Sequence, residues 1–248
     1  MFARKMGFIL VGLLWCGQCK KGTDPAPHWG YSGDHGPDHW GQLAADFQAC
    51  ATGSLQSPID IEEPLETISE PLVIRYTPAP LEVVNNGHTI QANLPDGSTL
   101  QHKGKLFKLI QFHFHTPSEN RIRGKAFPME LHMVHKGDAG QLYVIGVLMA
   151  EGKENEILTS IWKNLPGPDG KVSIESLDPA NLLPTRRDYY SFTGSLTTPP
   201  CSEGVNWLVM AEATWVSRRQ IDSFRSLFPG NARPPQKRAH RAIHFSEG

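Results

Sequence analysis

The chain has 248 residues, of which 39% are hydrophobic and 20% are charged, a composition typical of a globular protein with a substantial core. Its formal net charge is -1, so no overall basic field exists to bind nucleic acid or an anionic membrane. We find no internal repeat or low-complexity tract. The chemistry is therefore expected in a local site of a single domain.

The start of the chain predicts an export signal. Arg4 and Lys5 precede an apolar run over residues 6–15, which is too short to span a bilayer as a helix. A basic segment followed by a short apolar one is typical of a secretory signal, which we assign to residues 1–19. We therefore expect the protein to be periplasmic or secreted.

Residues 20–27 contain one glycine and two prolines and predict a linker, so the folded domain is expected over residues 28–248. Cys16 leaves lipid anchoring open, although the bulky Trp15 before it fits a lipoprotein processing site poorly. Release without an anchor is the default, and contact with a membrane is expected only for a lipid-anchored chain.

The folded part contains two cysteines, Cys50 and Cys201. In an oxidising compartment such a pair predicts a disulfide, and the alternative is two separate buried thiols. A bridge would close a loop of about 150 residues, for which the chain-entropy account gives a stabilisation of roughly 4 to 5 kcal/mol.

The domain begins with an aromatic, turn-rich segment over residues 28–40, which we expect to pack over the core through its rings. Two hairpins follow, each with a glycine in its turn. Their strands and turns are 81–85 and 88–93 about Asn86-Gly87, and 98–102 and 105–115 about Lys103-Gly104.

The second half of the chain combines strands with two short helices. The capping pair Ser217 and Gln220 predicts the start of the second helix. The other predicted elements are strands over 127–135, 142–149 and 207–210, a helix over 157–165 that Pro166 ends, and a stiff loop over 195–201.

One strand presents a polar face that can hold a metal. It ends in Gln111-Phe112-His113-Phe114-His115. Because successive side chains of a strand point to opposite faces, the glutamine and both histidines share one face and the phenylalanines share the other.

The next strand supplies a third histidine. The same rule places Glu130, His132 and Val134 on one side, whereas His135 falls on the opposite side and is interpreted as an outward-facing or packed residue. The 17 positions from His115 to His132 suit neighbouring antiparallel strands. Three imidazoles can therefore converge.

Three neutral histidines form a catalytic zinc pattern, because they leave one position of a tetrahedral Zn²⁺ open; carbonic anhydrase is the established example of this ligand set. Gln111 and Glu130 each lie two residues before a proposed ligand and on its face. There each can accept the ligand's second ring N–H and fix its tautomer. A lone His-x-His pair is more often a half-buried surface pair, and the third histidine with its acidic neighbour favours the metal site.

Four short stretches of the sequence together form a highly specific pattern. They are Gln-Phe-His-Phe-His at 111–115, Glu-Leu-His at 130–132, Asn-Asn-Gly-His at 85–88 and Ser-Leu-Thr-Thr-Pro-Pro at 195–200. With them the chain resembles the alpha-class carbonic anhydrases, and the bacterial secreted members most closely, from residue 29 to residue 234.

This resemblance implies a single domain of mainly β (α+β) class, built around a large, mostly antiparallel twisted sheet with short peripheral helices. It also implies a Zn²⁺ cofactor and the reversible hydration of CO2 to bicarbonate and a proton by attack of zinc-bound hydroxide. By resemblance, His113, His115 and His132 are the zinc ligands. Zinc lowers the pKa of its bound water to about 7, a value known from carbonic anhydrase itself.

The resemblance gives Thr197 and Glu119 catalytic roles. The Thr197 hydroxyl donates to the Glu119 carboxylate, so its oxygen is left to accept the hydrogen of the zinc hydroxide and to aim a lone pair at the substrate carbon. From the residues alone, the two would be an ordinary loop hydroxyl and a surface acid.

The substrate CO2 is small and has no net dipole, so it requires an apolar wall beside the zinc. By resemblance the substrate pocket consists of Val134, Val144, Leu196, Thr198 and Trp207. From the residues alone, the apolar members are equally plain core residues.

Proton release requires a further group. A histidine suits this role, because its pKa near 6.5 lets it pass the proton to buffer. His88 matches the proton shuttle of the family, working through water held by Tyr31, Asn86 and Gln91. From the pattern alone, a histidine at the start of a strand is more often a solvated surface residue.

The expected partner is a small molecule, CO2 or bicarbonate, with no nucleic acid, and a homodimer is left open. One competing interpretation is a catalytically silent carbonic anhydrase-like binding protein, but such relatives lose a zinc histidine, and all three are present here. Another zinc hydrolase such as a metalloprotease is disfavoured, because no His-Glu-x-x-His helix is present.

Two features depart from the bacterial relatives. Asn120 stands where they commonly have histidine, and we expect it to alter the support behind Glu119. The basic end over residues 235–248 is interpreted as a solvated tail, with a weak surface or subunit contact as the alternative. The loop that carries Thr197 is directly followed by Cys201, so a bridge to Cys50 would hold that loop in place.

Overall fold

The computed structural model describes residues 27–64, 66–163 and 165–247. The signal assigned to residues 1–19, and all of the linker assigned to 20–27 except its last residue, lie outside the described residues. None of the described helices is long and apolar enough to cross a membrane.

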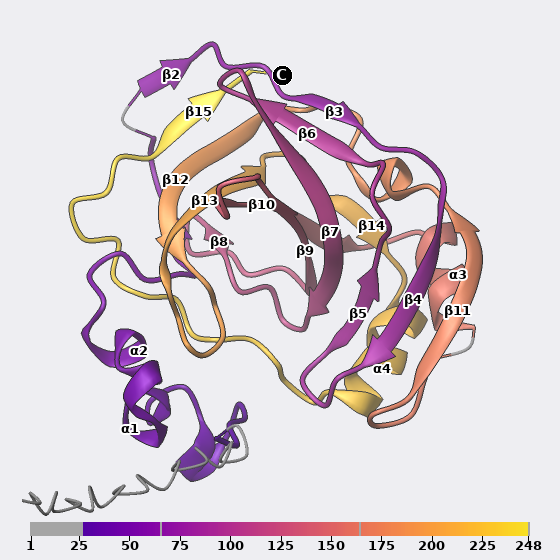
Figure 1. Cartoon of the computed structure of the whole chain (residues 1–248), viewed down its shortest axis with the longest axis horizontal. Coiled ribbons are helices and arrows are strands. Elements are labelled where there is room, and N and C mark those ends of the chain that lie inside the picture. The colour runs from indigo at the N-terminus through magenta and orange to yellow at the C-terminus, as the bar shows by residue number, and fades with distance from the viewer. Residues whose placement is uncertain (1–26, 65, 164, 248) are drawn as a thin grey trace, which may run out of the picture.

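A large twisted sheet of 13 strands dominates the described chain (Figure 1). Its strands are β2 (Glu66–Ile68), β3 (Val73–Arg75), β4 (Ala79–Asn85), β5 (Ile90–Asn93), β6 (Thr99–His102), β7 (Lys105–His115), β9 (Met129–Lys136), β10 (Leu142–Glu151), β11 (Lys171–Leu177), β12 (Tyr189–Ser195), β13 (Glu203–Met210), β14 (Thr214–Val216) and β15 (His244–Ser246). A separate parallel pair consists of β1 (Asp60–Ile61) and β8 (Arg121–Ile122).

The order of the main sheet is β11-β4-β5-β7-β9-β10-β13-β12-β15-β2, with β14 beside β10, and β3 beside β6, which pairs with β7. Parallel pairing is limited to β10 with β13 and β14, and β15 with β2. All other strand pairs described in this sheet are antiparallel. The mainly β class and the mostly antiparallel sheet predicted above are confirmed.

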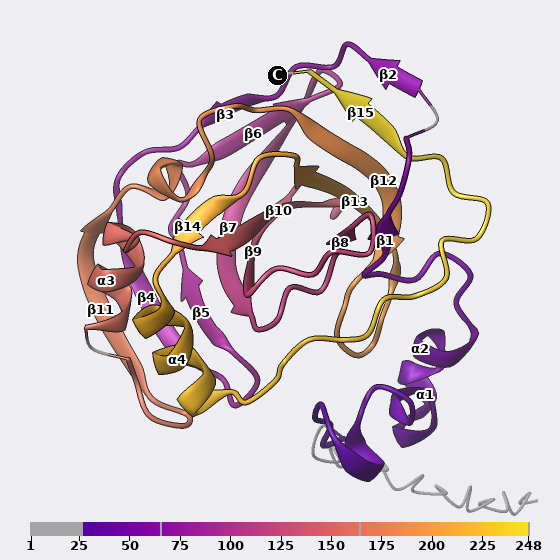
Figure 2. The ribbon, with the colours of Figure 1, turned by 180° about the vertical axis from the view of Figure 1, so that it is seen from behind.

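The helices are short and lie outside the sheet. They are α1 (Trp40–Leu43), α2 (Ala49–Thr52), α3 (Glu156–Trp162) and α4 (Arg218–Leu227), with 3-10 turns η1 (Gly33–His35), η2 (Ala45–Phe47) and η3 (Pro179–Leu182). Figures 1 and 2 place α1 and α2 at one end of the molecule and α3 and α4 at the other, beside β4 and β11. The predicted capping box of Ser217 and Gln220 starts α4.

The two predicted hairpins are present as β4–β5 and β6–β7. The first turn is longer than predicted, because the Asn86 side-chain oxygen accepts from the backbone N–H groups of His88 and Thr89. Strand β5 therefore begins at Ile90, and His88 lies in the turn instead of starting the strand.

Strand β7 contains a β-bulge at Ile110. Leu109 pairs with His135 and Gln111 with Val134, so the bulged strand has one extra residue at this point. The bulge shifts the alternation of faces: Phe107 and Leu109 before it, and Phe112 and Phe114 after it, all pack into the same hydrophobic core.

The two faces of the sheet bury different cores. Phe112, Phe114, Leu131 and Met133 belong to the larger core on one face. A smaller core on the other face includes Val134, Val144, Phe192 and Trp207. The alternation predicted for the two histidine strands is thus observed, with the aromatic side chains in the larger core and the histidines on the opposite face.

The basic C-terminal end is not a solvated tail. After α4 the chain crosses the molecule to β15, which pairs with both β12 and β2 (Figure 2). Ile243, Arg241 and Ser246 are buried. The prediction was wrong because net charge does not reveal that this segment completes the sheet.

Candidate metal centre

Strands β7 and β9 bring three histidines together. His113 and His132 are direct partners in the antiparallel pair, and His115 follows two residues after His113 on the same face. Each of the three offers one ring nitrogen, and these atoms all lie within 4.8 Å of one another. The convergence predicted from the two strands is therefore observed.

The second ring nitrogen of each histidine lies close to a different oxygen atom. Nδ1 of His113 lies 2.8 Å from Oε1 of Gln111, and Nε2 of His132 lies 3.0 Å from Oε1 of Glu130. Nδ1 of His115 lies 2.7 Å from the backbone carbonyl of Asn231. These contacts leave Nε2 of His113 and His115 and Nδ1 of His132 directed to a shared centre.

Sequence reasoning missed the acceptor behind His115. The group at Asn231 is a backbone carbonyl, so no residue type at that position indicates it. The Asn231 side chain also donates to the backbone carbonyls of His88 and Phe114 and accepts from the N–H of Thr116. One residue thus links the strand of the ligands to the turn that carries His88.

The three histidines fit a metal ion. Burial lowers the pKa of His113 well below its ordinary value, and the neighbouring His115 and His132 lower it further. Burial likewise lowers the pKa of His115, against the opposing effects of the Asn231 carbonyl and Glu130. Nε2 of His115 is buried and has no hydrogen-bond partner among the described residues. Neutral imidazoles with free nitrogens facing one point are the donor set that a divalent metal such as zinc accepts.

Glu130 is held by its own set of donors. Its Oε2 accepts from the backbone N–H groups of Glu119 and Asn120, and its Oε1 accepts from Nδ2 of Asn120 at 2.8 Å. Burial alone would raise the pKa of Glu130, but His132 and the Asn120 hydrogen bonds outweigh it and lower that pKa. The Asn120 side chain therefore supports Glu130, and not Glu119 as the sequence suggested.

Glu119 is fully buried, with Oε2 lying 3.5 Å from Nε2 of His115. Burial raises the pKa of Glu119 to about 7, although His132, a hydrogen bond from the backbone N–H of Arg233 and the Thr197 side chain all lower it. The Arg233 hydrogen bond measures 2.8 Å. The surface position suggested for Glu119 by the residues alone is thus excluded.

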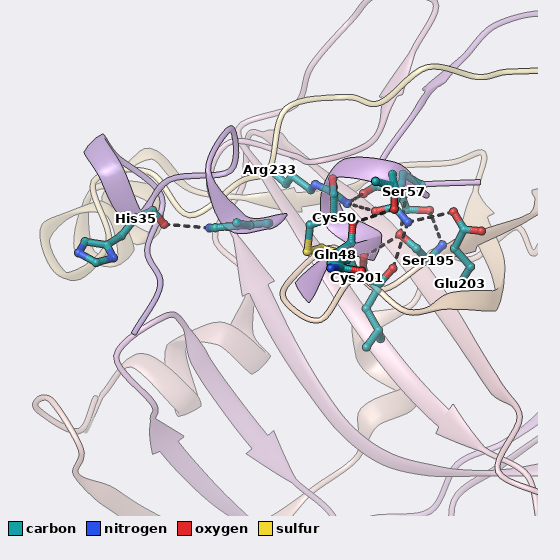
Figure 3. The surroundings of a disulfide bond; sticks show 12 residues. His35, Gln48, Cys50, Ser57, Ser195, Cys201, Glu203 and Arg233 are labelled. Carbon is teal, nitrogen blue, oxygen red and sulfur yellow. Dashed lines mark hydrogen bonds between the residues drawn. A yellow bond between two sulfur atoms is a disulfide. The ribbon is translucent and has the colours of Figure 1, made fainter. Parts of the chain in front are cut away.

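A disulfide joins Cys50 to Cys201, as predicted, and the alternative of two free thiols is excluded (Figure 3). Ser57 and Ser195 each accept from the other's backbone N–H through their hydroxyl oxygens, at 2.9 and 3.1 Å. Nη2 of Arg233 donates to the Cys50 carbonyl. The loop with Thr197 is therefore held at both ends, by the serine pair before it and by the disulfide after it.

The residues assigned to the substrate pocket gather beside His132. Val134, Val144 and Trp207 are buried in the smaller core, and Leu196 packs against it. The Trp207 ring centroid lies 4.8 Å from that of His132. For the fifth residue, Thr198, the structure records a backbone contact, its carbonyl accepting from the N–H of Cys201.

His88 is half-buried against the aromatic entry segment. Its ring stacks on Trp29, with centroids 3.7 Å apart and an interplanar angle of 4°. Partial burial lowers the pKa of His88, and His28 lowers it further. Trp29 was predicted to pack over the core, but its contact with the proposed shuttle was not foreseen, because it joins residues 59 positions apart.

The three residues proposed to hold water, Tyr31, Asn86 and Gln91, differ in the contacts that their side chains make. Tyr31 packs edge-on against Trp29, and burial raises its pKa well above the ordinary value, with Glu119 adding to the effect. Asn86 uses its side-chain oxygen in the turn. The Gln91 amide donates to Asn93. Of the three, only Tyr31 has no side-chain hydrogen bond within the described chain.

The family described as eukaryotic-type carbonic anhydrase matches residues 35–247. A carbonic anhydrase of Neisseria gonorrhoeae is 45% identical over 219 residues, covering 87% of each chain. The solved alpha-carbonic anhydrase of Photobacterium profundum has a TM-score of 0.84 and 46% identity, over 88% of this chain and 100% of its own. That of Thermovibrio ammonificans, solved with the inhibitor sulfanilamide, has a TM-score of 0.86 and 43% identity, over 89% of this chain and 100% of its own.

The fold, the three-histidine cluster and these similarities define a single class. The chain belongs to the alpha carbonic anhydrase family, whose members are lyases.

Proposed function

We propose that this protein catalyses the zinc-dependent, reversible hydration of CO2 to bicarbonate and a proton. The observation that carries the proposal is the convergence of His113, His115 and His132 beside an apolar wall. A bound Zn²⁺ would supply a nucleophile at neutral pH, because it lowers the pKa of coordinated water to about 7 in carbonic anhydrases.

Glu119 and Thr197 orient the reacting groups. In its ionised form, the Glu119 carboxylate accepts the Thr197 hydroxyl hydrogen, and the Thr197 oxygen is then available only as an acceptor on its other side. This arrangement fixes the direction from which CO2 is attacked. The backbone N–H of Arg233 on Oε1 of Glu119 supports the ionised form of the carboxylate.

The substrate is positioned without charged groups. Val134, Val144, Leu196 and Trp207 exclude water from one side of the centre, which suits a molecule with no net dipole. Thr198 is assigned to the same pocket by resemblance.

His88 transfers the proton from the site to buffer, with Tyr31, Asn86 and Gln91 holding the intervening water. His88→Ala is expected to slow turnover in weak buffer by about tenfold or more, and added imidazole is expected to restore it, since general acid–base groups contribute about 10² to 10⁴. A variant whose rate does not depend on buffer would exclude this role.

We further propose that the chain is exported, as the predicted signal over residues 1–19 indicates. The disulfide between Cys50 and Cys201 supports this, because such bridges persist in oxidising compartments.

The deciding experiment is stopped-flow CO2 hydration by the mature protein before zinc removal, after removal and after restoration. Hydration is expected to disappear and return with the metal. His115→Ala should lose both zinc and hydration, whereas the exposed His240→Ala serves as the matched control. A tightly bound zinc without hydration would instead favour the catalytically silent binding protein.

A further inference from the structure

A cavity of about 220 Å³ lies between β12, β13, β15 and the turn after β6; none of the three histidines lines it, although Trp207 of the proposed substrate pocket does. Four basic residues line it, and no carboxylate does. They are His102, Lys103, Arg241 and His244.

Three of these basic groups already have acidic partners. Oε2 of Glu70 lies 3.1 Å from the Lys103 ammonium and 3.5 Å from Nε2 of His102, and the His244 ring lies 3.0 Å from Oε1 of Glu66. Both carboxylates belong to residues that do not line the cavity.

Arg241 is different, because it is only 6% exposed and forms none of the ion pairs within 4 Å in the described chain, although Glu203 attracts its charge from a longer distance. Three of its N–H groups donate to backbone carbonyls: Nε to Arg238, Nη2 to Lys237 and, at 3.5 Å, Nη1 to Thr193. A guanidinium carries five donors, so two remain. A buried charge without a close counter-charge is costly, which favours an anion beside it.

The wall of the cavity also offers neutral donors. The hydroxyls of Tyr143, Ser191 and Thr193 form no hydrogen bond with any other residue among those that the structure describes. Hydroxyl groups rotate freely and can turn their hydrogens toward a bound acceptor. The cavity thus combines one buried positive charge that has no carboxylate within 4 Å with three hydroxyls that no other described residue engages.

We propose that this cavity binds a small oxyanion, with the Arg241 guanidinium as its counter-charge and the hydroxyls of Tyr143, Ser191 and Thr193 as hydrogen-bond donors. The cavity has room for more than one water molecule, as a sulfate-sized anion requires. The site does not depend on the function proposed for the metal centre, because none of the three clustered histidines lines it.

The test is a sulfate titration of the zinc-loaded protein, followed by backbone amide NMR and compared with chloride at equal ionic strength. Saturable shifts are expected at the amides of Ser191, Thr193 and Ala242. Binding at the metal centre would instead shift the amides of residues 113–115, so the two events are separated by their position in the chain.

Arg241→Met is expected to weaken sulfate binding at these amides by about tenfold or more, since a hydrogen bond to a charged group contributes about 1.5 to 3 kcal/mol. Arg238→Met is the matched control, because it makes the same change in the same segment, and the Arg238 guanidinium faces Glu62 outside the cavity. A double variant, Tyr143→Phe with Ser191→Ala, tests the donors without removing a buried charge and is also expected to weaken binding.

No shift at the three amides with sulfate at tens of millimolar would overturn the proposal. So would equal affinity in the wild type, Arg241→Met and the double variant. If Arg241→Met does not fold, the double variant alone decides, since it leaves the guanidinium and its backbone contacts in place.

Discussion

Asn120 is a residue whose side chain acts through another residue. It donates to the Glu130 oxygen that also faces His132, and its own oxygen accepts from the backbone N–H of Ile59. The Asn120 amide is therefore oriented by contacts of both its oxygen and its nitrogen. The Glu130 carboxylate that it holds orients His132, the proposed ligand.

We predict that Asn120→Ala weakens zinc affinity by about tenfold, because loss of an outer partner of a metal ligand costs about 10- to 100-fold. Competition with a chromogenic chelator measures the affinity. Asn120→His, which retains an N–H donor, should restore part of it. Asn155→Ala, which removes the cap of α3 far from the site, should lower stability without changing zinc affinity. Unchanged affinity in Asn120→Ala would contradict the role.

Trp29 covers one face of the His88 ring. Stacking on the indole ring removes water from the imidazole, and burial disfavours its charged form, so the pKa of His88 lies below 6.5. A shuttle with a lowered pKa releases its proton readily but is protonated less often at neutral pH.

Trp29→Leu should expose His88 and raise its pKa toward 6.5, and the pH profile of kcat should move in the same direction. An NMR titration of the imidazole measures the pKa directly. Trp215→Leu is a suitable control, because that exposed indole lies in β14, away from His88. A pKa that falls or stays constant in Trp29→Leu would show that the stacking does not control ionisation.

At the scale of the element, the bulge at Ile110 determines which residues of β7 face the larger core. Phe107 and Leu109 are odd-numbered and Phe112 and Phe114 are even-numbered, yet all four are buried in one core. A regular strand would place the two pairs on opposite faces. The extra residue is what places His113 and His115 on the face opposite the larger core.

Deletion of Ile110 is predicted to retain zinc binding, because it removes the unpaired residue and leaves every other side chain of β7 on its present face. Deletion of Phe112 is the contrasting variant, since it would turn both histidines into the larger core and should abolish zinc binding. Metal content after dialysis distinguishes the two. Loss of zinc in both variants would mean that the bulge itself positions the proposed ligands, and not the alternation of side chains along the strand.

At the scale of the whole molecule, Arg233 joins segments far apart in the chain. Its backbone N–H holds Glu119, and its guanidinium donates to Gln56 and to the carbonyls of Ser57 and Cys50, at 2.8 to 2.9 Å. The disulfide ties the same N-terminal segment to Cys201, directly after the loop that carries Thr197 (Figure 3).

Reduction of the disulfide is predicted to lower the free energy of unfolding by about 4 to 5 kcal/mol, the chain-entropy value for so long a loop. Urea unfolding with and without reductant measures it. Cys50→Ser/Cys201→Ser should match the reduced protein and be insensitive to reductant. We expect part of the activity to survive, because the Arg233 hydrogen bonds do not require the bridge; a complete loss in a folded variant would show that the disulfide alone positions the loop.

The local pattern of the sequence indicated two hairpins, three further strands, two helices and the three histidines of the candidate metal centre. Alternation along two strands placed His113, His115 and His132 on one side, and two glycine turns and a capping box marked the hairpins and α4. The tertiary structure alone decided the contacts of residues distant in sequence: the Asn231 carbonyl on His115, the Arg233 N–H on Glu119 and the burial of the C-terminal segment. Periodicity reports which face a side chain occupies, but contacts between segments more than 100 residues apart arise only when the sheet closes, and no local pattern encodes them.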